Sequence, residues 1–313
     1  MTTVGNELKS RNVNWKKYAF VYGMIAFPIV QFAIFYIWVN FNSIIIAFQE
    51  FDGYMEAGGE KYIWSLQNFK NFFLEWKLPN SEVIIGLKNT LKYFIVNLVF
   101  LLPACFLISY FLYKKIAGYK AFRVIFFLPS IISAVVLVTV YKNIIQKYGP
   151  VYTILDELFN YQLPSLLSNN ATATPTIIFY TIWSGFGVNI ILFQGAMSRI
   201  PPEIIEAGKI DGVGMTRELF QIVMPLVWPT ISTVVILAFV GLFSSSGEIL
   251  LFTKGLYDTY TISYWIFEMV QGVKGTVNLE YASTVGIFFS AIALPIVLLV
   301  KRGLEKVTES VEY

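Results

Sequence analysis

The chain has 313 residues, of which 56% are hydrophobic and only 14% are charged, and its mean hydropathy is +0.63. These values exclude an ordinary soluble domain and predict a membrane protein. The formal net charge is only +3, and the basic residues are scattered through short connections, which argues against nucleic acid as a partner.

The sequence lacks histidine, has a single cysteine and shows no common catalytic or nucleotide-binding motif. It contains no histidine, which excludes histidine acid–base chemistry and imidazole metal sites. The single cysteine, Cys105, excludes an intrachain disulfide and a cysteine metal cluster, and we interpret it as a small buried hydrophobic residue. Phosphate-loop, nucleophile-elbow and dinucleotide motifs are also absent from the sequence. We therefore expect neither an enzyme nor a metal site.

A bilayer core about 30 Å thick requires roughly 20 apolar residues in a helix. Six stretches satisfy this length, so we expect an all-α membrane protein with one domain of six transmembrane helices over residues 18–300. The expected spans are 18–41, 86–113, 122–145, 175–197, 224–246 and 278–300. Residues 1–17 are followed by an apolar stretch of full spanning length with no small-residue cleavage site, so we expect the first span to be retained.

Lysine and arginine gather in the tail 1–17, in the second and fourth connections, and in the tail 301–313. Because cytoplasmic segments are enriched in these residues, both termini are predicted to be cytoplasmic. The opposite face carries the long connection 42–85, with a glycine-rich FDGYMEAGGEKY followed by an amphipathic SLQNFKNFFLEW. The second run is expected to lie along the membrane surface. This connection is either a docking platform for an external partner or a lid on the helix ends.

The fourth connection, 199–223, predicts two short helices rather than a simple tether. Pro201 and Pro202 fit the first turn of a helix, and Glu203 follows where a helix dipole favours an acid. Asp211 and Gly212 are expected to end this helix. A second helix follows with one apolar stripe of Met215, Leu219, Ile222 and Val223, and Pro225 and Pro229 mark the return to the membrane.

Ala207 and Gly208 leave one turn of the first helix almost without side chains. Such a turn can be approached closely by another protein, or it can pack on its own bundle.

Polar residues in the fourth and fifth spans form a candidate binding site, because lipid offers them no partner. In the fourth span Thr181, Gly185 and Asn189 recur at four-residue spacing, with Trp183 and Ser184 beside them. The fifth span carries Thr230, Thr233, Gly241, Ser244 and Ser245, followed by Glu248. Both sets can line one cavity, and both also suit simple helix packing.

The order E-A-G-x-x-D-G followed by P-x-x-x-P resembles the EAA loop of permease subunits in binding-protein-dependent ATP-binding-cassette importers. The flanking IPPE and MPLVWP are similar to the carbohydrate, or maltose-type, branch. The resemblance implies the type I importer permease fold, in which this loop forms a helix that seats in a separate ATPase. It implies a coupling role for Glu203, Glu206, Ala207, Gly208, Asp211 and Gly212. Gly208 departs from the family pattern, which usually has a second alanine there.

The resemblance further implies a bacterial cell membrane protein that imports a carbohydrate, expected to be an oligosaccharide. Its implied partners are a related second permease, an ATPase dimer that binds ATP and Mg²⁺, and an external solute-binding protein, and this chain binds no cofactor itself. Maltose-type permeases place an aromatic residue in contact with sugar at a position matching Trp183, beside Gly185. The spans lack clustered arginine or lysine, so a neutral sugar is expected. The alternatives are a secondary sugar or ion transporter, and a membrane-embedded enzyme or scaffold.

Overall fold

The computed structural model describes residues 15–55, 58–244, 247–272, 275 and 277–309. Within these residues, four helices are long and apolar enough to cross a bilayer. They are Tyr18–Ala47, Glu82–Tyr113, Ala173–Met197 and Leu279–Val307. Two further helix pairs are sharply bent, and the number of spans rises to six if each pair crosses once. The mostly helical architecture of the prediction is confirmed.

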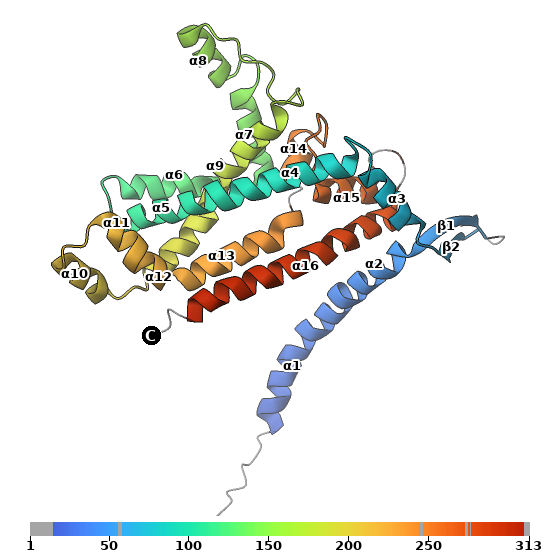
Figure 1. The fold of residues 1–313 in the computed structure, drawn as a ribbon, viewed down its shortest axis with the longest axis horizontal. Helices are drawn as coiled ribbons and strands as arrows, with labels where there is room; N and C mark the ends of the chain where they lie inside the picture. The colour runs from blue at the N-terminus through green and yellow to red at the C-terminus, as the bar shows by residue number, and fades with distance from the viewer. Residues whose placement is uncertain (1–14, 56–57, 245–246, 273–274, 276, 310–313) are drawn as a thin grey trace, which may run out of the picture.

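The first span consists of α1 (Trp15–Phe32), a π-helical segment η1 (Ala33–Trp38) and α2 (Val39–Ala47). It ends at Ala47, later than the predicted residue 41. Figure 1 shows α1 leaving the rest of the molecule, while α2 packs on α16 (Leu279–Glu309). The described residues of α1 and η1 are all exposed, whereas Ala47 at the end of α2 is fully buried.

A β-hairpin follows the first span, so the prediction of an all-α protein is wrong for residues 49–64. Strand β1 (Gln49–Tyr54) pairs antiparallel with β2 (Glu60–Trp64). Aromatic side chains favour strands because they pack across neighbouring strands, and Phe51 lies opposite Tyr62 with ring centroids 6.0 Å apart. The predicted amphipathic helix is confirmed as α3 (Gln67–Trp76).

The second span runs end to end through α4 (Glu82–Val96), the π-helical segment η2 (Asn97–Leu101) and α5 (Leu102–Tyr113) (Figure 1). Pro103 explains the wide turn, because a proline lacks the N–H that would bond the preceding turn and its ring clashes there. The backbone N–H of Leu102 bonds instead to the carbonyl of Asn97, five residues back. The fourth span is the straight helix α9 (Ala173–Met197), which packs along α5.

The third predicted span, 122–145, is not one continuous helix. Helix α6 (Tyr119–Ile131) ends at Ile132, whose ψ of 140° is extended, and α7 (Ala134–Ile145) leads to α8 (Pro150–Phe159). The bend across this break is 110°. Pro129 lies inside α6 and removes a backbone donor near its end. Figure 1 shows α6 beside the bundle and α7 and α8 projecting from it.

The fifth span is bent by 73° at Val227, between Met215–Leu226 and Trp228–Phe243. Its elements in chain order are α11 (Met215–Arg217), η3 (Glu218–Val223), α12 (Met224–Leu226), α13 (Trp228–Val240) and η4 (Gly241–Phe243). Pro225 and Pro229 flank this bend, as predicted. The described chain continues through α14 (Gly247–Phe252), α15 (Ile262–Gln271) and α16.

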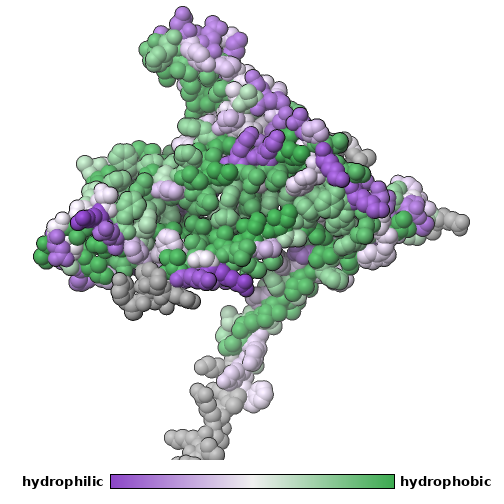
Figure 2. Space-filling view, in the orientation of Figure 1, coloured by the Kyte–Doolittle hydropathy of each residue, from purple (hydrophilic) through white to green (hydrophobic). Residues whose placement is uncertain are grey.

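Three clusters of buried apolar side chains hold these helices together. The first joins α5, α9, α13 and the connection 199–223, and it contains the buried Cys105, as predicted. The second lies at the hairpin end around Phe72 and Trp265. The third joins α4, α7, α9 and α14 around Tyr141 and Tyr180. The face of the bundle shown in Figure 2 is largely hydrophobic, which suits contact with lipid.

Candidate functional site

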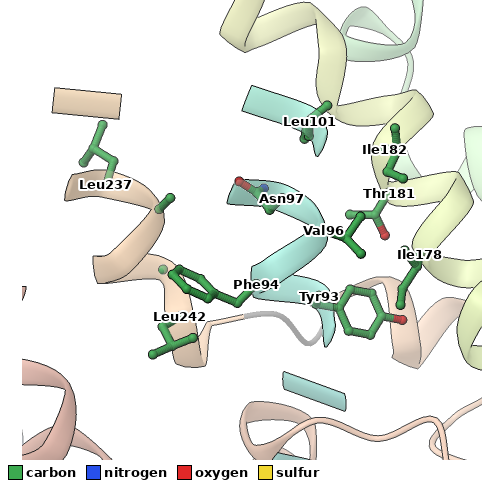
Figure 3. A pocket seen from close by; sticks show the side chains of 12 residues that line it. Tyr93, Phe94, Val96, Asn97, Leu101, Ile178, Thr181, Ile182, Leu237 and Leu242 are labelled. Atoms are coloured by element: carbon green, nitrogen blue, oxygen red, sulfur yellow. The ribbon is translucent and has the colours of Figure 1, made fainter. Parts of the chain in front are cut away.

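A cavity of about 220 Å³ lies between the second, fourth and fifth spans (Figure 3). Its walls come from α4 and η2, from α9, and from α13 and η4. The lining residues are Tyr93, Phe94, Val96, Asn97, Leu101, Ile178, Thr181, Ile182, Leu237, Ala238, Gly241 and Leu242. None of these side chains is charged, so the cavity suits an uncharged ligand.

Tyr93, Asn97 and Thr181 supply the polar side chains of this lining. Tyr93 is 8% exposed, and its hydroxyl has no hydrogen-bond partner among the described residues. The Thr181 hydroxyl donates to the carbonyl of Ile177 at 2.8 Å. A buried hydroxyl without a partner is costly, and of these three polar side chains Tyr93 is the one that carries such a hydroxyl, enclosed in the cavity wall.

The π-helical segment η2 places Asn97 and Leu101 in the same wall as Tyr93. Tyr93, Phe94 and Asn97 were not among the predicted site residues, which came only from the fourth and fifth spans. A signal was present, since Asn97 is a polar residue inside an apolar run and lies four residues after Tyr93.

Of the predicted substrate residues, Thr181 and Gly241 meet in this cavity. Gly185 instead faces the second span, because a Cβ added to it would lie 2.7 Å from Cδ2 of Leu101. Helix packing therefore explains this glycine. Trp183 stacks on Tyr141 at a centroid distance of 6.2 Å, in the third hydrophobic cluster. The prediction that Trp183 and Gly185 share a cavity with Gly241 is not met in this structure.

Of the remaining predicted substrate residues, those that the structure describes do not line the cavity. Ser184 donates to the carbonyl of Thr181 at 3.4 Å, and Asn189 donates to the carbonyl of Gly185 at 3.1 Å, both within α9. Ser244 is exposed just beyond η4. Ser245 lies outside the described residues. A sugar contact by these residues stays a prediction.

The first helix predicted in the connection 199–223 is confirmed as α10 (Pro202–Ile210). Its N-terminal residue is Pro202, and Glu203 lies in its first turn. The N–H of Asp211 bonds to the carbonyl of Ala207 at 3.0 Å, and Gly212 then adopts a left-handed φ of 74°. This glycine ends the helix as predicted, because few other residues accept that conformation.

Helix α10 presents one face to solvent and buries the other. Glu203, Glu206 and Ala207 are exposed, and so are Asp211 and Gly212 directly after the helix. The most prominent apolar side chain in this region is Ile210, which is 86% exposed. The sequence analysis did not single out Ile210. The exposed face is thus a small, partly acidic surface that also carries two isoleucines, Ile204 and the more exposed Ile210.

Gly208 corrects the interpretation of the small residues. It is buried, and a Cβ at this position would lie 2.9 Å from Cδ1 of Ile222. Of the two alternatives for this turn, Gly208 therefore fits packing within its own chain, and a coupling role for it stays a prediction. Gly208 lets α10 pack closely on η3, and only Ala207 keeps the small side chain outward.

A second hollow, of about 570 Å³, lies between the β-hairpin and the start of α16. Glu50, Glu60 and Glu280 line it together with aromatic side chains of the strands. Tyr62 donates a hydrogen bond to Glu60 at 2.6 Å. This bond and the negative charges of Glu60 and Glu280 raise the pKa of Tyr62 to about 12. The hairpin end is therefore a negatively charged surface.

The sequence matches a model of the family described as binding-protein-dependent transport system inner membrane component over residues 102–307. It is 26% identical over 304 residues to YteP of Bacillus subtilis (strain 168), a polygalacturonan/rhamnogalacturonan transport system permease protein, covering 93% of this chain and 89% of that protein. It is 24% identical to AraP, an arabinooligosaccharides transport system permease protein of the same bacterium, covering 76% of this chain and 73% of AraP.

The fold is similar to that of a chain in the crystal structure of a bacterial ABC transporter involved in the import of the acidic polysaccharide alginate. The TM-score is 0.79 at 23% identity, and the match covers 94% of this chain and 97% of the other. A similarity at this identity establishes the shared fold.

Proposed function

Because the chain belongs to the family of inner membrane components of binding-protein-dependent transport systems, we propose that it is the permease subunit of an ATP-driven importer of oligosaccharides. The observation that carries this proposal is the uncharged cavity between α4, α9 and α13, with the unpartnered hydroxyl of Tyr93 in its wall. Aromatic rings and a few polar groups are the usual means of holding a sugar ring.

The relatives support the choice of a carbohydrate, because YteP and AraP are named for the transport of polysaccharide or oligosaccharide. YteP is named for an acidic polysaccharide, but the cavity of this chain contains no lysine or arginine that would pair with a carboxylate. We therefore propose that the sugar unit held in the cavity is neutral.

Transport in this proposal is driven by a separate ATPase dimer, which binds ATP and Mg²⁺. The exposed face of α10, with Glu206, Ala207 and Ile210, is the surface proposed to seat in this ATPase. A second permease completes the pathway across the bacterial membrane. An external binding protein delivers the sugar to the hairpin end, where the negative hollow around Glu60 and Glu280 supports a docking role for residues 42–85 over the alternative of a lid.

Purification of the tagged protein from its own membranes in mild detergent tests this proposal. Mass spectrometry of the co-purifying chains is expected to find an ATPase, a second permease and a solute-binding protein. Calorimetry on that binding protein with neutral and acidic oligosaccharides then identifies the substrate class. A chain that purifies alone, and transports sugar in liposomes without any ATPase, would instead be a secondary transporter.

A further inference from the structure

Glu218 is a buried acid in the second helical part of the connection 199–223. It begins the π-helical segment η3 and is only 4% exposed. Its Oε1 and Oε2 lie 2.8 Å and 2.9 Å from the Lys114 ammonium at the end of α5. The fully buried Tyr110, also on α5, donates its hydroxyl to Oε1 at 3.1 Å.

This arrangement joins two segments separated by about a hundred residues of sequence. A buried carboxylate is strongly unfavourable unless it is paired and hydrogen-bonded. Glu218 therefore has its low-energy position only where Lys114 and Tyr110 both reach it. The Tyr110 hydroxyl also lies 3.2 Å from the carbonyl of Met215, which holds the start of the same helix.

The packing around this ion pair is apolar. Ile205 of α10, Leu219 and Val223 of η3, and Phe106 of α5 belong to one hydrophobic cluster. Apolar contacts are non-directional, so they do not by themselves fix one register of the connection on α5. A charged pair with three hydrogen bonds does specify a register, because a shift leaves a charge buried and unpaired.

Helix α5 is the continuation of the helix that lines the cavity. Tyr93, Asn97 and Tyr110 lie on one 32-residue span, and Lys114 directly follows its last residue, Tyr113. At 1.5 Å per residue, Lys114 lies roughly 25 Å along this helix from Asn97. On the other side, Gly208 packs on Ile222, so α10 is tied to η3. The contacts thus form a continuous path from α10 to the cavity wall.

We propose that Glu218 is a positioning residue that locks the connection 199–223 onto α5 through Lys114 and Tyr110, so that a displacement of α10 reaches the cavity-lining helix. This inference rests on the proposed function, since it assumes that a partner ATPase moves α10. It assigns a specific link between the exposed surface of α10 and the cavity.

The test uses the complete transporter with its ATPase and second permease in lipid nanodiscs, and measures ATP hydrolysis with and without sugar-loaded binding protein. Glu218→Gln and Lys114→Met are expected to keep basal hydrolysis but to lower the sugar-stimulated increase about fivefold or more, in the range of typical coupling energies. The exchange variant, which combines Lys114→Glu with Glu218→Lys, is expected to regain most of the sugar-stimulated increase. Glu305→Gln is the matched control, because Glu305 pairs with Lys301 on an exposed face of α16 at 3.7 Å.

Stimulation equal to wild type in both single variants would overturn the inference. An exchange variant that assembles normally but stays unstimulated would also overturn it, because the charges would be restored without the function. If the single variants do not assemble, the sugar-stimulated ATP hydrolysis of the exchange variant tests the inference alone. A wild-type complex that sugar does not stimulate would contradict the proposed function itself, whereas loss in the variants alone concerns only the lock.

Discussion

Gly208 of α10 lies directly against Ile222 of η3, so close that a Cβ on the glycine would come within 2.9 Å of the isoleucine Cδ1. The small residue therefore allows two helices of one connection to touch. Because the approaching atom is the end of a flexible side chain, a single added methyl can be accommodated by a small shift of Ile222.

Gly208→Ala is expected to change the free energy of unfolding by less than about 1 kcal/mol, because the gain in helix propensity offsets the tight contact. Gly208→Trp is expected to displace α10 and to abolish sugar-stimulated ATP hydrolysis. Thermal unfolding and ATP hydrolysis of the purified complex measure both effects. Full stimulation in the tryptophan variant would show that the contact with Ile222 does not hold α10 in place.

Glu206 is exposed on α10 and is available to a partner protein. Glu206→Lys is expected to leave the protein inserted and folded, because a fully solvated charge contributes little to stability. It is expected to release or uncouple the ATPase, because a reversed charge meets the partner surface. Co-purification and sugar-stimulated hydrolysis provide the measurements. Glu157→Lys is the control, because it reverses the charge of an exposed residue on α8. Normal sugar-stimulated ATP hydrolysis with the Glu206 variant would contradict the coupling role of Glu206.

Ile210 is 86% exposed, the highest fraction among the exposed large hydrophobic side chains that the structure describes. If it is buried against the ATPase, Ile210→Ser removes about 1.5–3 kcal/mol of burial energy and weakens the complex about tenfold or more. Titration of the ATPase onto the permease in nanodiscs measures this loss. Leu158→Ser is the matched control, because Leu158 is 72% exposed on α8, away from α10. If the Ile210 and Leu158 variants bind the ATPase with equal affinity, Ile210 does not contribute to this interface.

The sequence predicted the helices where periodicity and turn residues agree. Pro202 and Gly212 bound α10 as expected, because a fixed φ and a left-handed φ act locally. The cavity was harder to predict, because four-residue spacing places residues on one face of a helix without saying what that face meets. Gly185 thus met Leu101 rather than a cavity. The π-helical turn after Val96 likewise has no clear sequence pattern beyond Pro103.

Tyr93 provides a test that separates substrate binding from stability. Its buried hydroxyl has no partner among the described residues, so Tyr93→Phe is expected to stabilise the protein without sugar by about 1 kcal/mol, or about 2 °C in Tm. The same change is expected to raise the sugar concentration for half-maximal ATP stimulation about threefold to tenfold, because a hydrogen bond to the sugar is lost.

Tyr141→Phe is the matched control, because it removes the same atom from a tyrosine that is also 8% exposed. The Tyr141 hydroxyl donates to the carbonyl of Thr176 at 3.2 Å, so its loss is expected to destabilise the protein by about 1 kcal/mol and to leave sugar stimulation unchanged. Tyr141 also stacks on Trp183, the sugar contact implied by the family resemblance. A sugar defect in the Tyr141 variant and not in the Tyr93 variant would therefore move the binding site from the cavity to the Trp183 side of α9.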